Sequence, residues 1–110
     1  MTDPLPSDPA FDMNDLDEVI HGRVRLGVLA CLAAADRAEF NELKARLRTT
    51  DGTLSVHLRK LEEAGYIAVE KGYNGRKPVT RLSMTEQGRK AFQAYLTAIS
   101  RLAGLGDESP

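Results

Sequence analysis

The chain has 110 residues, a net charge of −1 and one cysteine, so its length suits one folded domain rather than several. Hydrophobic residues make up 42% of it and charged residues 28%, which is typical of a globular protein in water. No apolar run reaches the roughly 18–20 residues of a membrane-spanning helix, and no secretory signal is visible, so we expect a cytoplasmic protein with no membrane partner. The single cysteine, Cys31, excludes an internal disulfide.

The small net charge hides a segregation of charge along the chain. Every charged residue between positions 1 and 20 is acidic: Asp3, Asp8, Asp12, Asp15, Asp17 and Glu18. The segment 44–81 is instead rich in bases: Lys44, Arg46, Arg48, Arg59, Lys60, Lys71, Arg76, Lys77 and Arg81. A chain polarised in this way can present a basic surface to an anion although its overall charge is close to zero.

The N-terminal third is predicted to hold a disordered segment and one long helix. Residues 1–14 are rich in proline and aspartate, so we predict a disordered lead-in. From Asp15 onward, apolar residues at helical spacing predict a helix. This stripe consists of Leu16, Val19, Ile20, Val24 and Val28. Between Leu26 and Ala35 the helix is apolar on almost all sides, which in a small domain predicts burial against a second subunit.

Two shorter helices are predicted next, separated by a turn. Phe40, Leu43 and Leu47 indicate a short helix, for which Asn41 is the expected N-cap. Thr50 is suited to cap a third helix over 51–64, which stops at Gly65 because glycine readily adopts the left-handed conformation. The core face of the third helix is a stripe of leucines: Leu54, Leu58 and Leu61.

A hairpin and a last helix complete the domain. Alternating apolar residues predict strands over 66–72 and 79–84, and the turn 73–78 has Asn-Gly at its tip, a strong hairpin signal. Thr85 is expected to cap the last helix, and 104–110 to form a flexible tail. The expected fold is mainly α with a β-hairpin wing (α+β), in one domain over 15–103.

The order of these elements points to DNA. Two helices joined by a short turn form a helix-turn-helix, and a hairpin directly after them makes a winged helix-turn-helix. The second helix of such a pair lies in the major groove and reads base edges with its N-terminal part. In this chain, the outward residues of 53–60 occupy that part.

The chain resembles the small winged-helix transcriptional regulators of the MarR/ArsR-like superfamily, especially a short MarR-like dimeric group. The matching stretches are VIHGRVRLGVLACL, FNELKARL, LSVHLRKLEEAGYI and EKGYNGRKPVTRLSMTEQGRKAF. The resemblance implies a homodimer built on the terminal helices, recognition by the helix 51–64, and contact of the wing 73–78 with phosphates or the minor groove. The thiolate metal-sensing motif of many ArsR-type proteins is absent from this sequence, so metal control is not implied.

The site residues follow from this resemblance and from the apolar stripes. In the third helix, the implied DNA-binding residues are Thr53, Ser55, Val56, His57, Arg59 and Lys60. In the wing they are Asn74, Gly75, Arg76 and Lys77. His57 lies roughly 60° from the leucine stripe on a helical projection, so packing and DNA contact both stay open for it. Surplus apolar surface predicts a dimer interface of Leu26, Leu29, Phe92, Tyr95, Leu96, Ile99 and Leu102.

Catalysis and metal binding have little support in the sequence. Ser55 and His57 point away from each other on a helix, and no glycine-rich phosphate loop or nucleophile elbow is present. His21 and Cys31 are roughly 15 Å apart on one predicted helix, too far to share a zinc ion within one subunit. We therefore expect no enzyme, no metal and no cofactor, while a small-molecule effector stays open.

The expected function is sequence-specific DNA binding by a homodimeric transcriptional regulator that acts as a repressor. Its two-fold symmetry predicts a pseudopalindromic operator with half-sites about one helical turn apart. The alternative is a winged-helix module for protein–protein interaction without DNA binding. The two hypotheses differ in whether the basic residues of the third helix and the wing are required for function.

Overall fold

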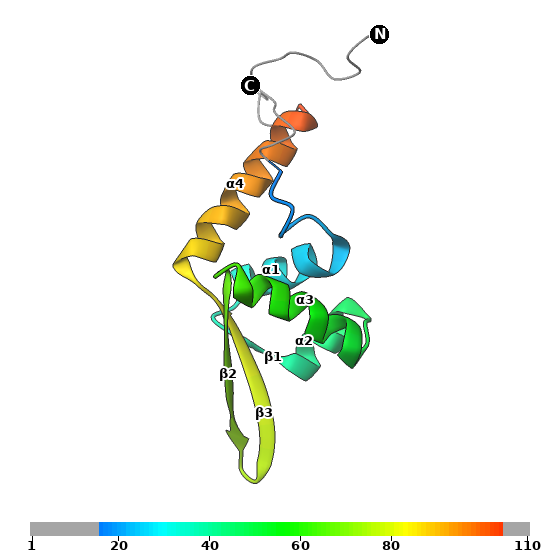
Figure 1. The fold of residues 1–110 in the computed structure, drawn as a ribbon, viewed down its shortest axis with the longest axis vertical. Helices are drawn as coiled ribbons and strands as arrows, with labels where there is room; N and C mark the ends of the chain where they lie inside the picture. The colour runs from blue at the N-terminus through cyan, green and yellow to red at the C-terminus, as the bar shows by residue number, and fades with distance from the viewer. Residues whose placement is uncertain (1–15, 105–110) are drawn as a thin grey trace.

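The computed structural model of the protein describes residues 16–104, so the predictions for 1–14 and for 105–110 lie outside the described residues. The elements in chain order are α1 (Arg23–Ala34), β1 (Ala38–Glu39), α2 (Phe40–Leu47), α3 (Asp51–Glu63), β2 (Ile67–Asn74), β3 (Lys77–Met84) and α4 (Glu86–Leu102). The helices α1, α2 and α3 form a body from which the β2–β3 hairpin and α4 extend in opposite directions (Figure 1). The predicted winged-helix fold is confirmed.

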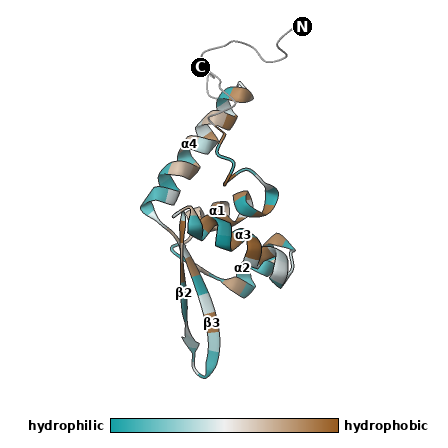
Figure 2. Cartoon of the chain, in the orientation of Figure 1, coloured by the Kyte–Doolittle hydropathy of each residue, from teal (hydrophilic) through white to brown (hydrophobic). Residues whose placement is uncertain are grey.

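The body is held together by the leucine stripe of α3. Leu54, Leu58 and Leu61 are buried in one hydrophobic core with residues of α1 and α2. The members of this core that α1 and α2 supply include Val28, Leu29, Leu32 and Leu43. Each buried leucine contributes about 1.5–3 kcal/mol of transfer free energy. In Figure 2 the hydrophobic colour collects where these helices meet, while the tip of the hairpin is hydrophilic.

The first helix begins later than predicted. We expected it to start near Asp15, but α1 starts at Arg23, and Gly22 before it has a φ of 152° that a helix cannot contain. The preceding residues form a turn in which the N–H groups of Ile20 and His21 donate to the Asp17 carbonyl, at 3.1 and 2.9 Å. Ile20 is nevertheless fully buried, because this turn folds back onto the core.

Two side-chain hydrogen bonds fasten this turn to distant parts of the chain. The Tyr66 hydroxyl donates to the carboxylate of Asp17, and this bond, aided by burial, raises the pKa of Tyr66 to about 12. The Nδ1 atom of His21 lies 2.7 Å from the Tyr95 hydroxyl. The turn before α1 is thus connected both to the start of the hairpin and to α4.

A short strand before α2 was not predicted. Strand β1 pairs antiparallel with β3, with Ala38 opposite Leu82 and Glu39 opposite Arg81, so the sheet has three strands in the order β1-β3-β2. Two residues are too few for a period-two pattern to show in the sequence. The N-cap of α2 is Glu39 rather than Asn41, and the Glu39 N–H donates to the Glu42 side chain at 3.4 Å.

The hairpin is confirmed, but its turn is displaced by one residue. Asn74 is opposite Lys77 in the register, so Gly75 and Arg76 form the two-residue turn. Gly75 has a φ of 66° and Arg76 is not among the residues with positive φ. A glycine at the first turn position followed by a residue with negative φ is the sign pattern of a type II′ turn, which suits the twist of the two strands. Asn74 therefore stays in β2.

The start of α4 is set by a cap and by a close backbone approach. The Thr85 hydroxyl accepts the Gly88 N–H at 2.9 Å and donates to the Gly65 carbonyl at 2.6 Å, which confirms Thr85 as the N-cap. A Cβ at Gly88 would lie only 2.0 Å from the carbonyl oxygen of Tyr66. Only glycine allows α4 to leave the sheet at this position.

The substitution Gly88→Ala should therefore destabilise the protein, by about 1–3 kcal/mol or more, because the backbone at Tyr66 has to move. Gly52→Ala is the matched control: a Cβ there meets no atom within 4 Å, and alanine favours the helix by up to about 1 kcal/mol. Urea unfolding followed by circular dichroism measures both effects. Equal stabilities of the two variants would contradict this account of Gly88.

Candidate nucleic-acid interface

The outer face of α3 is defined by the burial of its inner face. Because Leu54, Leu58 and Leu61 point into the core, the residues on the opposite side of the helix must face solvent. The exposed members of the predicted set are Thr53, Ser55, Val56, Arg59 and Lys60. Val56 keeps 52% of its surface exposed, although it is apolar. An apolar side chain on such a polar face is suited to contact the methyl group of a thymine.

The turn between α2 and α3 is fixed by local contacts. Arg48 adopts the left-handed conformation with φ 52°, which ends α2. Thr50 then caps α3, since its hydroxyl oxygen accepts the N–H of Thr53 at 3.2 Å. Lys44 of α2 and Asp51 of α3 form an ion pair at 2.7 Å across the turn. These contacts set the angle between the two helices of the helix-turn-helix.

The wing tip forms the second exposed group. Asn74, Gly75, Arg76 and Lys77 are all exposed, at the far end of the hairpin from the core. Within residues 16–104, Lys44–Asp51 is the one pair of opposite charges closer than 4.0 Å, so neither Arg76 nor Lys77 has a neutralising partner there. Unpaired cations on a protruding turn are suited to contact phosphate oxygens or the minor groove.

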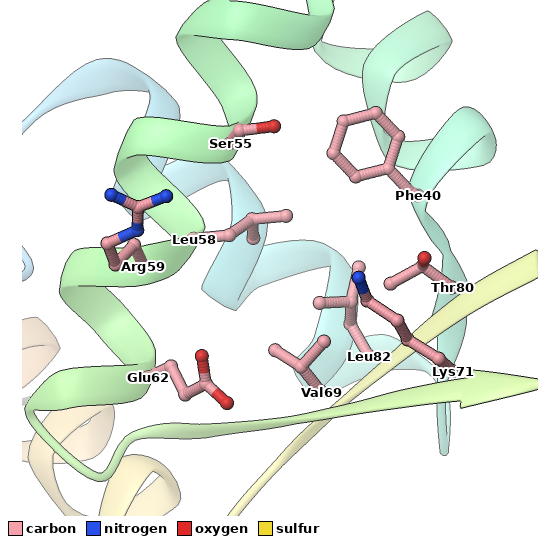
Figure 3. Close-up of a pocket in the computed structure, with 9 residues that line it drawn as sticks. All are labelled: Phe40, Ser55, Leu58, Arg59, Glu62, Val69, Lys71, Thr80 and Leu82. Carbon is pink, nitrogen blue, oxygen red and sulfur yellow. The ribbon is translucent and has the colours of Figure 1, made fainter.

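A groove of about 240 Å³ separates α3 from the wing (Figure 3). Leu58 of α3 and the strand residues Val69 and Leu82 lie in its middle, and Phe40 closes one end. Polar side chains surround this apolar floor: Ser55, Arg59, Glu62, Lys71 and Thr80. The outer face of α3 and the wing are thus joined by a continuous hollow.

The sequence interpretation missed two residues of this groove, Lys71 and Thr80. They are opposite each other in the hairpin, two pairs further along than Val69 and Leu82 and on the same face of the strands. The signal was present, since residues two apart in a strand face the same way, and both strands were predicted from their alternating apolar residues. The next pair on that face places Tyr73, 71% exposed, opposite Pro78.

His57 lies on the flank of α3 that faces α1, opposite the flank that lines the groove. It is half-buried, and its Nδ1 atom is buried without a hydrogen-bond partner in the described part of the chain. Burial and, after it, the positive charges of Arg25 and Lys60 lower the pKa of His57 below 6.5. The side chain therefore packs partly against the body, and contact of His57 with DNA stays a prediction.

The predicted dimer residues divide into two groups. Leu29 has no exposed surface, and Phe92 and Tyr95 are also buried in the core of their own chain. Leu29 therefore has no surface to offer to a partner, contrary to our expectation. Leu26 and Ile99 are half-buried, whereas Leu96 and Leu102 are 45% and 53% exposed.

Contacts within the same chain explain why α1 is apolar on almost all sides. Its second side faces α2, where a Cβ at Gly27 would lie 2.6 Å from Leu47. The residues of α1 that stay exposed toward its end are small: Ala30, Ala33 and Ala34. Cys31 is partly buried against the core. The surplus apolar surface is therefore concentrated on α4 rather than on α1.

Residues 16–104 carry no candidate metal site. They contain no group of three or more His, Cys, Asp or Glu side chains placed to hold a metal ion. None of the helices in this described range is long and apolar enough to cross a membrane.

Comparison with known proteins agrees with this geometry. Residues 24–103 match the family described as winged helix DNA-binding domain, and the chain belongs to this family. An uncharacterized protein of Methanocaldococcus jannaschii is 37% identical over 86 residues, which cover 78% of this chain and 94% of that protein. Among solved structures, a transcriptional regulator homologue from Pyrococcus horikoshii OT3 superposes with a TM-score of 0.70 at 26% identity, covering 84% of this chain and 96% of that chain.

The fold is also that of the MarR and ArsR families. Lactococcus lactis ZitR, a zinc-responsive MarR family member, gives a TM-score of 0.54 at 20% identity, covering 86% of this chain and 64% of that chain. An ArsR family transcriptional regulator shares the fold as well. The fold and family of this chain are thus those of transcriptional regulators, as the sequence resemblance predicted.

Proposed function

We propose that this protein is a cytoplasmic, homodimeric and sequence-specific transcriptional repressor that binds a pseudopalindromic operator. The observation that carries the proposal is the pairing of two exposed surfaces, the outer face of α3 and the wing tip, whose cations lack partners in the described range. Family membership supports DNA as the ligand. A repressor of this kind acts by occupying its operator, so binding is the whole of its chemistry.

In the proposed complex, α3 lies in the major groove. Thr53, Val56 and Arg59 face outward on its N-terminal part, which is the part that reaches base edges in helix-turn-helix proteins. Arg59 can donate two hydrogen bonds to a guanine, and Val56 can contact a thymine methyl. The wing then meets the adjacent phosphates or minor groove through Arg76 and Lys77.

The proposed dimer uses the surface of α4 that its own chain leaves uncovered. Leu96 and Leu102 are about half exposed, and Ile99 between them is partly exposed. A contiguous apolar strip favours association, and a second copy of the chain covers it symmetrically. Because α4 extends away from the wing (Figure 1), this arrangement leaves both wings free for DNA.

Recognition by α3 can be tested by selecting duplexes from a random pool with the purified chain. The expected result is enrichment of a pseudopalindrome, in which Arg59→Ala or Val56→Ala weakens the preference at particular bases by about 1–3 kcal/mol. Binding to the selected duplex and to single-base variants, measured by fluorescence anisotropy, gives these values. A uniform loss over all sequences would assign the residue to backbone contact. No enrichment by the wild-type chain would favour a protein-interaction module instead.

The wing should contribute to the affinity for DNA rather than to sequence specificity. Arg76→Ala combined with Lys77→Ala should weaken binding to all duplexes similarly and lower the log–log salt slope by up to about two, near one for each lost phosphate contact. The matched control is Arg89→Ala with Lys90→Ala, which removes the same charges from exposed positions on α4. Equal salt slopes for the two double variants would show that the wing tip does not touch DNA.

Substitutions on the exposed leucines test the dimer without opening the core. Leu96→Glu with Leu102→Glu should place unpaired charges in the interface, convert the protein to a monomer and weaken binding to a two-site operator sharply. Sedimentation equilibrium at tens of micromolar measures the change, and Gln93→Glu, at an exposed polar position of α4, is the control. A monomeric wild-type chain would contradict the dimer and the pseudopalindrome together.

A further inference from the structure

The flank of α3 that faces α1 carries a second group of basic side chains, away from the wing. Arg25 comes from the first turn of α1, and His57 and Lys60 come from α3. Nε of Arg25 and Nδ1 of His57 are both buried and have no hydrogen-bond partner in residues 16–104. Buried polar atoms in proteins are nearly always paired, so these two nitrogen atoms leave hydrogen-bonding capacity unused on this flank within residues 16–104.

No ion pair within residues 16–104 neutralises the charges on this flank. Glu18 and Glu63 line the same hollow as Arg25 and Lys60, yet none of these groups forms an ion pair within 4.0 Å in the range that the structure describes. The guanidinium of Arg25 bends back to Gly22, the N-cap of α1, and no acidic residue stands in the first turn of that helix. Cations at a helix N-terminus are unfavourable, and an anion at this place relieves them.

The position of this flank relative to α3 identifies the anion. A helix in the major groove has one sugar–phosphate strand on each side. In the proposed complex, one strand lies along the groove that holds Arg59 and Lys71, so the other strand lies along the flank that holds Arg25 and Lys60. We propose that Arg25, His57 and Lys60 form a backbone phosphate site for this second strand, and that His57 takes up a proton when the phosphate binds. This inference rests on the proposed function.

The direction of the proton linkage follows from the charges around His57. The groups that face it are Arg25 of α1 and Lys60 of its own helix, and its lowered pKa keeps it neutral near pH 7 in the free protein. A phosphate stabilises the imidazolium, so the pKa rises in the complex and the proton comes from the buffer. DNA affinity therefore increases as pH falls through the pKa of the complex, by up to about ten-fold per pH unit for each site, and levels off below the pKa of the free protein.

Calorimetric titration in two buffers of different ionisation enthalpy measures this proton uptake directly. The probe is a mixed-sequence duplex of about 30 base pairs at low salt, since phosphate contacts do not depend on sequence. We expect the full chain to take up as much as one proton per bound protomer near neutral pH. His57→Gln, which keeps a hydrogen-bond donor, should abolish the uptake. His21→Gln, which removes the other histidine of the chain, should retain it.

Arg25→Ala and Lys60→Ala provide an independent measurement. Each should weaken binding several-fold and lower the salt slope by about one, and Lys60 is exposed, so its variant tests the site even where a change at half-buried Arg25 disturbs folding. Equal proton uptake by the wild-type chain and His57→Gln, or unchanged salt slopes in both alanine variants, would overturn the phosphate site while leaving the proposed function intact. A wild-type chain that binds no duplex would overturn both.

Discussion

The burial of three leucines on one side of α3 is the constraint on which the rest of the structure depends. Leu54, Leu58 and Leu61 fix the rotation of α3 about its own axis, because a turn of 100°, the step of one residue, would expose them and bury polar side chains. That rotation alone decides which residues face outward. The outer face of α3 is therefore a consequence of core packing, and it needs no separate contact to hold it in place.

The wing depends on the same core through strand alternation. Ile67 and Val69 face the body and are matched across the hairpin by Met84 and Leu82, so the inner face of the wing is fixed where it leaves the core. The pairs beyond them on that face line the groove and then reach the tip. The hydrogen bond from Thr85 to the Gly65 carbonyl joins the two ends of the hairpin at its base. A rigid base lets a solvent-exposed hairpin keep a defined direction.

Much of this arrangement could be predicted from the sequence, because helix caps, the leucine stripe and the hairpin are local features. The failures have physical causes. The apolar spacing of Val19 and Ile20 continues that of α1, which led us to predict one continuous helix. A turn buries Ile20 equally well, and the backbone conformation of Gly22 excludes the helix at this position. Whether Leu29 and Tyr95 are covered by their own chain or by a partner depends on contacts between distant segments, which periodicity does not contain. Lys71 was not predicted as a site residue although its strand was predicted. The groove beside Lys71 is formed jointly by the hairpin and α3, and the sequence pattern of a strand does not show how a helix packs beside it.

The distribution of charge explains how a protein with a net charge of −1 can serve as a DNA-binding protein. Phosphate contacts depend on the local electrostatic potential, and the basic side chains without an ion-pair partner in residues 16–104 lie on both flanks of α3 and at the wing tip. Lys44 is paired with Asp51 and stabilises the turn instead. A low overall charge keeps indiscriminate attraction to polyanions weak. In the proposed complex, affinity requires that the flanks and the wing meet the backbone together, which happens only when α3 fits the groove. Few cations around an exposed Val56 and Arg59 then make the proposed binding depend on base recognition.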